Sequence, residues 1–129
     1  SSTEILEEEM EIRMLSPVCV DLAYYEGEKT KTRYLDPLDP YFNYYLTKNF
    51  QRKFQAATGE KTDTGIFLLP HQNFNIQRSK YVTKFGGDIF ITAWTGNFTL
   101  KADIESLQFL YDIGLGARNS QGFGMFKKV

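Results

Sequence analysis

The stretch DPYFNYYLTKNFQRKFQAATG, residues 39–59, predicts one amphipathic helix. Asp39 followed by Pro40 is a good helix start, with Asp as the N-cap and Pro in the first turn. Gly59 stands where a left-handed residue would end the helix. Apolar side chains recur every fourth residue and so share one face of this helix: Phe42, Leu46, Phe50 and Phe54.

Strand-like segments lie on both sides of this helix. Apolar and polar residues alternate over 10–15, and a hairpin is expected from Tyr24 to Tyr34. After the helix, residues 74–85 and 88–100 predict two long strands around the turn Gly86-Gly87. A second helix is expected from Asp103 to Gly114, followed by a short last strand over 125–129.

The predicted order is strand, helix, strand, strand, helix, strand, with the hairpin inserted after the first strand. This order is typical of an α+β, ferredoxin-like domain, in which two helices cover one face of an antiparallel sheet. We expect this domain over residues 9–129. Residues 1–8 are expected to be an acidic, solvated lead-in that includes tag or linker sequence.

Composition excludes several classes of protein. The chain has 129 residues, of which 42% are hydrophobic and 16% aromatic, so a packed core is expected rather than disorder. Its apolar runs are too short to span a bilayer, so no membrane partner is predicted. One cysteine and one histidine exclude an internal disulfide and a zinc cluster. We therefore expect a cytoplasmic protein without a metal or cofactor.

The formal net charge of −1 hides an uneven distribution of charge along the chain. Residues 1–47 hold four basic and ten acidic residues, a net charge of −6. Residues 48–129 hold eleven basic and six acidic residues, a net charge of +5. Such asymmetry between the halves of a chain indicates a polyanionic partner for the basic half.

Four of the ten glycines lie in the segment GLGARNSQGFG, residues 114–124. Glycine lets backbone N–H groups approach a ligand closely and form anion-binding nests. Arg118 adds a planar guanidinium suited to phosphate, and Asn119, Ser120 and Gln121 add neutral donors. The segment follows a helix and lacks Gly-Lys-Ser/Thr, which excludes a dinucleotide-binding turn and a P-loop. The alternative is a plain connection between the last helix and the last strand.

This tail, together with Trp94-x-Gly96-x-Phe98-x-Leu100 and Met14-Leu15-Ser16-Pro17-Val18, resembles the second domain of the CRISPR repeat-processing RAMP endoribonucleases (the Cas six family). The three matches occur in the family's order and cover nearly the whole chain. Family members usually carry two ferredoxin-like domains. The resemblance therefore implies that this chain is the second half of a longer protein.

The resemblance implies binding of CRISPR repeat RNA and metal-independent cleavage by attack of a ribose 2′-hydroxyl on the adjacent phosphate. The catalytic groups would come from the missing first domain, so no residue here is assigned to catalysis. Other CRISPR-associated proteins and a second copy of the chain are further partners that we consider. The alternative is a non-catalytic RAMP subunit of a CRISPR ribonucleoprotein complex.

Twelve residues are predicted to bind RNA, most of them in the tail: Gly114, Gly116, Arg118, Asn119, Ser120, Gln121, Gly122, Gly124, Lys127, Lys128, Arg78 and Lys80. Lys127 and Lys128 place positive charge beside the glycine-rich segment. Arg78 and Lys80, on the strand expected over residues 74–85, fit a solvated face equally well.

His71 is the only histidine, and a general base is its most specific role because imidazole titrates near neutral pH. The competing interpretation is an ordinary loop histidine. If His71 were catalytic, the chain would be an unrelated small ferredoxin-like enzyme, active alone and inactivated by His71→Ala.

Overall fold

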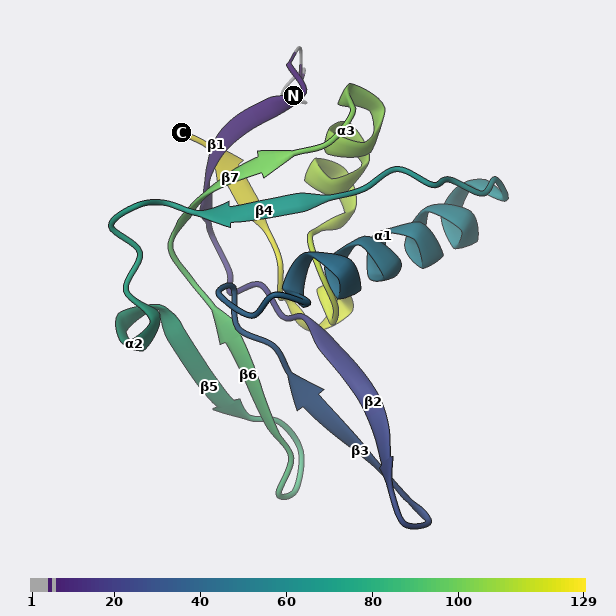
Figure 1. Ribbon diagram of the computed structural model, residues 1–129, viewed down its shortest axis with the longest axis vertical. Helices are drawn as coiled ribbons and strands as arrows, with labels where there is room; N and C mark the ends of the chain where they lie inside the picture. Colours follow the sequence, from purple (N-terminus) through teal and green to yellow (C-terminus); the bar gives the residue numbers. More distant parts are fainter. Residues whose placement is uncertain (1–4, 6) are drawn as a thin grey trace.

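The main sheet has four antiparallel strands in the ferredoxin-like order (Figure 1). The computed structural model of the chain describes Ile5 and residues 7–129. Across the sheet the strands are β4 (Phe67–Pro70), β7 (Asn97–Lys101), β1 (Glu9–Met14) and β8 (Phe126–Lys128). With helices α1 (Phe42–Thr58) and α3 (Ile104–Ile113), the chain order is β1-α1-β4-β7-α3-β8. The predicted fold class is therefore confirmed.

Both long helices cover the same face of this sheet. Burial alternates along β1, where every second side chain is enclosed and the others are exposed. The enclosed sheet positions are Met10, Ile12, Met14, Leu68, Phe98, Leu100 and Phe126. They share one hydrophobic core with the apolar face of α1 and with Leu107 and Leu110 of α3. The opposite face of the sheet carries the charged residues Glu11, Arg13 and Lys127, together with the exposed apolar side chains of Phe67 and Leu69 on β4.

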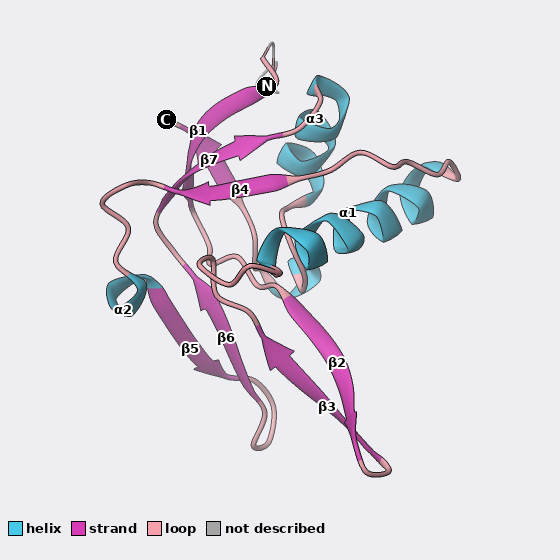
Figure 2. Cartoon of the chain, viewed as in Figure 1, coloured by secondary structure: helices cyan, strands magenta, loops and turns pink. Residues whose placement is uncertain are grey.

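Two hairpins extend from one end of the main sheet (Figure 2). The first is the predicted one, formed by β2 (Asp21–Glu26) and β3 (Lys29–Tyr34). The second pairs β5 (Lys80–Lys84) with β6 (Phe90–Trp94), and the one-turn helix α2 (Ile76–Ser79) precedes β5. Neither hairpin belongs to the four-stranded sheet.

The prediction that residues 74–85 form the second strand of the sheet, directly after the long helix, is wrong. Phe67–Pro70 takes that place, and Leu68 lies opposite Leu100. The side chain of Asn75 accepts hydrogen bonds from the backbone N–H groups of Gln77 and Arg78, which starts a helical turn where extended backbone was expected.

The predicted strand over residues 88–100 is interrupted. Gly96 has φ of +117°, a conformation that an extended strand does not contain. It separates β6, which pairs in the second hairpin, from β7, which pairs with β1 and β4.

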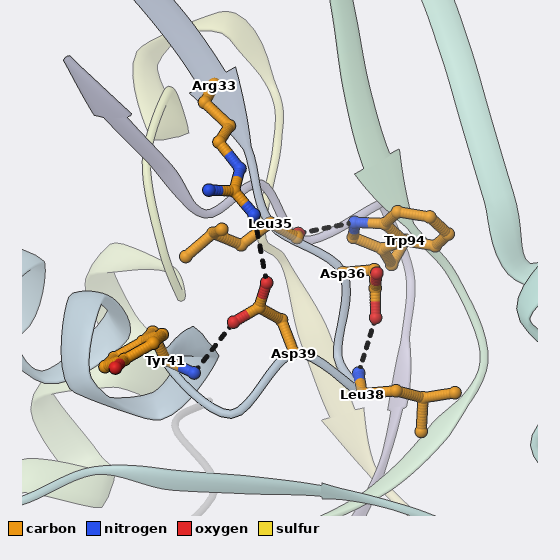
Figure 3. Close-up of polar contacts among 7 residues, drawn as sticks. All are labelled: Arg33, Leu35, Asp36, Leu38, Asp39, Tyr41 and Trp94. Carbon is orange, nitrogen blue, oxygen red and sulfur yellow. Dashed lines mark hydrogen bonds and ion pairs between the residues drawn. The ribbon is translucent and has the colours of Figure 1, made fainter. Parts of the chain in front are cut away.

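Helix α1 begins later than predicted (Figure 3). Asp39 is not its N-cap, because the first helical residue is Phe42 and the cap position is Tyr41. The carboxylate of Asp39 accepts a hydrogen bond of 2.8 Å from the Tyr41 N–H and lies 3.4 Å from Arg33 Nη2 of β3. Asp39 thus stabilises the turn before the helix and connects it to the first hairpin.

The other predicted helix boundaries are confirmed. Gly59 ends α1 with φ of +77°. Asp103 caps α3 by accepting a hydrogen bond of 2.8 Å from the Ser106 N–H, and Gly114 follows the last residue of α3. Residues 1–4 and 6 of the expected lead-in lie outside the described residues. Ile5 is buried in the core, so the lead-in is not solvated throughout. None of the described helices is long and apolar enough to cross a membrane.

Candidate functional site

The glycine-rich loop, residues 114–125, joins α3 to β8 and lies against residues 17–19. The Ala117 N–H donates to the Cys19 carbonyl at 2.7 Å, and the Gly124 N–H donates to the Pro17 carbonyl at 2.9 Å. The Leu115 N–H donates to the Gly124 carbonyl at 2.9 Å, which closes the loop on itself. The loop is therefore a fixed part of the fold and more than a plain connection.

Three glycines of the loop are buried and leave no room for a side chain. Gly116 has φ of +72°, and a Cβ atom there would collide with the Cys19 carbonyl oxygen. Gly124 has φ of +84°, and its Cβ would collide with the Leu115 carbonyl oxygen. Gly114 is buried as well. These three glycines would therefore contribute to RNA binding only indirectly, by fixing the shape of the loop.

Lys53 of α1 stabilises the glycine-rich loop through hydrogen bonds. Its Nζ donates hydrogen bonds to the Gly114 carbonyl at 2.9 Å, the Gly116 carbonyl at 2.8 Å and Asn119 Oδ1 at 2.8 Å. The three acceptors use all three hydrogens of the ammonium group. Burial lowers the pKa of Lys53 from 10.5 to about 8. A protonated lysine therefore stabilises the loop at neutral pH.

Asn119 links the two ends of the loop. Its Nδ2 donates to the Leu115 carbonyl at 3.2 Å and to the Phe123 carbonyl at 3.0 Å, while its Oδ1 accepts from Lys53. The side chain predicted as an RNA donor is thus already used inside the loop.

Arg118 connects the loop to the first hairpin. Its guanidinium lies 3.7 Å from the Asp21 carboxylate and donates hydrogen bonds to the Tyr34 hydroxyl at 3.4 Å and Gln121 Oε1 at 3.3 Å. These contacts balance the positive charge that was predicted to face phosphate. About a quarter of the side chain, 26%, remains exposed.

The buried groups around Arg118 stay neutral. Burial raises the pKa of the Cys19 thiol to about 12, and the nearby Asp21 carboxylate adds to this effect. Burial also raises the pKa of Tyr34. At neutral pH Cys19 is therefore a buried thiol rather than a nucleophilic thiolate, as its flanking valines suggest.

Three consecutive backbone N–H groups of the loop are unused. Arg118 is left-handed, with φ of 63°, and the 3₁₀ turn Asn119–Gln121 follows it. Among the described residues, none accepts a hydrogen bond from the N–H of Arg118, Asn119 or Ser120. Successive N–H groups in a left-handed to right-handed turn form a concave donor site for an anion. We call this feature the 118–120 nest.

The remaining predicted RNA-binding residues divide into two groups. Lys127 and Lys128 are exposed on β8 beyond the end of the loop, and Lys127 lies opposite Arg13 of β1. Arg78 and Lys80 do not share a strand, because Arg78 lies in α2 and Lys80 begins β5. Figure 1 shows α2 on the side of the molecule away from α1.

His71 lies in the loop between β4 and α2, as the interpretation of an ordinary loop histidine expects. Its ring nitrogen Nδ1 lies 3.0 Å from Asn73 Oδ1, and the side chain is exposed.

Lys53 is the site residue that the sequence analysis missed. It stands beside the apolar stripe of α1, and no acidic residue lies three or four positions away to neutralise it on the helix. This pattern would have been the only sequence signal, and it does not identify the partner, which is about sixty residues away.

Comparison with known proteins agrees with this architecture. The family model described as "CRISPR associated protein Cas6, C-terminal" matches residues 1–128. The chain is 27% identical over 121 residues to the CRISPR-associated endoribonuclease Cas6 1 of Methanocaldococcus jannaschii, covering 92% of this chain and 44% of that protein. It is 26% identical over 117 residues to the CRISPR-associated endoribonuclease Cas6 of Pyrococcus furiosus, covering 88% of this chain and 39% of that protein.

Solved structures share the fold. The product of a Cas6-related gene from Pyrococcus furiosus superposes with a TM-score of 0.83 at 24% identity, over 100% of this chain and 51% of that one. A RAMP protein described as binding different RNA substrates superposes with a TM-score of 0.82 at 24% identity, over 100% of this chain and 52% of that one. The chain spans less than half the length of the curated relatives that it matches. It belongs to the Cas6 family and corresponds to the C-terminal domain of its members.

Proposed function

We propose that this chain is the RNA-binding C-terminal domain of an endoribonuclease that processes CRISPR precursor RNA. The 118–120 nest supports this proposal most directly, because it offers three unused N–H donors on a loop that cannot rearrange easily. A phosphate of the repeat RNA is the anion that such a nest would bind in a protein of this family.

Charge near the loop favours the same ligand. Lys127 and Lys128 are exposed on β8, and no acidic residue follows Asp112 in the sequence. The nest and these two lysines would each contact a phosphate of the repeat RNA, while the Asp21 carboxylate beside the nest stays paired with Arg118.

The cleavage step would use groups from outside this chain. The ribose 2′-hydroxyl would attack the adjacent phosphorus while the bond from phosphorus to the 5′-oxygen breaks. One product would then end in a 2′,3′-cyclic phosphate and the other would begin with a 5′-hydroxyl. A base, an acid and a cation near the phosphate would assist this transfer, without a metal ion. Among the described residues, the hydrogen-bond partner of the His71 ring is the neutral side chain of Asn73, which is not the arrangement of an acid–base pair.

An electrophoretic mobility shift of CRISPR repeat RNA with the complete gene product tests the proposal at two salt concentrations. Binding should weaken as salt increases, because each neutralised phosphate releases counterions. The double substitution K127Q and K128Q should reduce the slope of log K against log salt by about 2, since each lost phosphate contact lowers it by about 1. Lys29→Gln, at the tip of the first hairpin, is the matched control and should leave the slope unchanged.

Failure to bind the repeat RNA in a salt-dependent manner would refute the RNA-binding role. Binding without cleavage by the complete gene product would instead assign the protein to the non-catalytic RAMP subunits.

A further inference from the structure

A hollow of about 280 Å³ separates the glycine-rich loop from the second hairpin. Three segments that are far apart in the sequence line it: Ser16 and Pro17, alternate residues of β5 and its continuation, and residues 121–123. Of the residues predicted from the sequence to bind RNA, only Gln121 and Gly122 line the hollow. The hollow is thus a separate feature beside the 118–120 nest.

The strand alternation explains why one face of the second hairpin borders the hollow. Tyr81 and Thr83 lie opposite Ala93 and Ile91 of β6. Ala93 and Ile91 are buried in one small cluster with Phe123 of the loop. The face of β5 that carries Tyr81 and Thr83 is therefore turned towards the loop, while the neighbouring lysines of β5 belong to the other face.

The walls of the hollow are aromatic and exposed. Tyr81 is 45% exposed and Phe85 is 44% exposed, and both line the hollow. Phe123 is only 6% exposed and closes the hollow from the loop side. Exposed aromatic rings facing a cavity are surfaces on which a flat ligand can stack.

The polar groups of the hollow are neutral. Gln121 Oε1 accepts a hydrogen bond of 3.3 Å from Arg118, which leaves both hydrogens of its Nε2 for a ligand. The hydroxyl of Thr83 adds a donor and an acceptor, and none of the described residues that line the hollow is charged. Aromatic faces combined with neutral hydrogen-bonding groups match the face and the edge of a nucleobase, and they do not match a phosphate.

We propose that this hollow binds one unstacked nucleobase of the repeat RNA. This inference rests on the proposed function, because the nucleotide would be held by its phosphate at or near the 118–120 nest, whose last residue is next to Gln121. RNA is recognised by sequence chiefly where bases are unpaired and stack on aromatic side chains. The hollow would make binding depend on a base at one position of the repeat.

The test uses the complete gene product and repeat RNAs in which each nucleotide in turn is replaced by an abasic one. At one position, loss of the base should weaken binding by the wild type about 5-fold to 100-fold, since stacking of one base contributes about 1–3 kcal/mol. The double substitution Y81L and F85L should bind the intact RNA and that abasic RNA equally. The slope of affinity against salt should stay unchanged, because stacking releases no counterions.

Tyr25→Leu is the matched control, because Tyr25 is an exposed aromatic residue on the other hairpin. It should retain the full abasic profile of the wild type. If the wild type binds the RNA but no single position is sensitive, the nucleobase proposal is overturned and the proposed function stands. The same conclusion follows if the Tyr81 and Phe85 double variant keeps the wild-type profile. Absence of any RNA binding by the wild type would overturn both.

Discussion

Replacing Lys53 by Met is expected to destabilise the chain and loosen the glycine-rich loop. Met keeps most of the length of the side chain but removes the three hydrogen bonds to Gly114, Gly116 and Asn119. A hydrogen bond to a charged group contributes about 1.5–3 kcal/mol. The substitution also removes the cost of burying a charged group, which lowers the pKa of Lys53 from 10.5 to about 8.

A lowering of this size corresponds to roughly 3 kcal/mol of unfavourable free energy for the charged form in the folded state. The lost hydrogen bonds outweigh that relief, so the free energy of unfolding should fall by about 2–5 kcal/mol at pH 7. Urea unfolding followed by the fluorescence of Trp94, the single tryptophan, measures it. Lys48→Met, an exposed lysine of the same helix, is the control and should change stability by less than about 0.5 kcal/mol.

A second measurement is the pH dependence of the difference in free energy of unfolding between the wild type and Lys53→Met. Below pH 8, Lys53 is protonated in both the folded and the unfolded state, so its burial cost is fully present. Between about pH 8 and 10.5 the unfolded state binds more protons, and the stability of the wild type therefore rises relative to Lys53→Met. Equal stabilities at pH 7, or the same pH dependence for both proteins, would refute this account of Lys53.

Three further outcomes are expected. Gly124→Ala should destabilise the chain by more than about 3 kcal/mol, because a Cβ atom there collides with the Leu115 carbonyl. Gly122→Ala, with open space around it, should cost only about 1 kcal/mol in the same urea assay. Equal effects would contradict the close packing of the loop. Leu68→Ala should cost about 2–5 kcal/mol and Leu69→Ala, which is 37% exposed, far less; the reverse order would mean that the register of β4 is wrong. Cys19 should resist a thiol-specific reagent at pH 8 in the native protein and react after unfolding, since burial raises the pKa of its thiol to about 12. Rapid reaction of Cys19 in the native protein would show that this region opens.

Local chemistry explains which elements could be predicted from the sequence. Gly59 and Asp103 mark helix ends through their own backbone and side-chain preferences, and both act as predicted. The strand Phe67–Pro70 was missed because it has only four residues and its alternation is too short to detect. The segment from residue 74 to 85 has a longer alternating pattern, but the cap formed by Asn75 overrides it.

The density of glycines predicts a loop between the last helix and the last strand, and the structure contains that loop. That the loop binds RNA stays a prediction. The sequence could not show that Asn119 and Arg118 are engaged by the rest of the fold, because their partners Lys53 and Asp21 come from distant segments. Nor could it show that the donors of the loop without an acceptor among the described residues are backbone N–H groups, since their arrangement depends on the left-handed conformation of Arg118.

The position of β1 in the sheet has a consequence for the synthesis of the protein. Within this domain β1 is made before both strands that flank it, β7 and β8. Until residue 101 has emerged, the edge of β1 that pairs with β7 has no neighbouring strand, and its second edge stays open until residue 128 appears. An unpaired apolar strand of this kind is what chaperones bind. Slow translation of the segment from β7 to β8 would prolong the interval in which β1 pairs with the wrong partner.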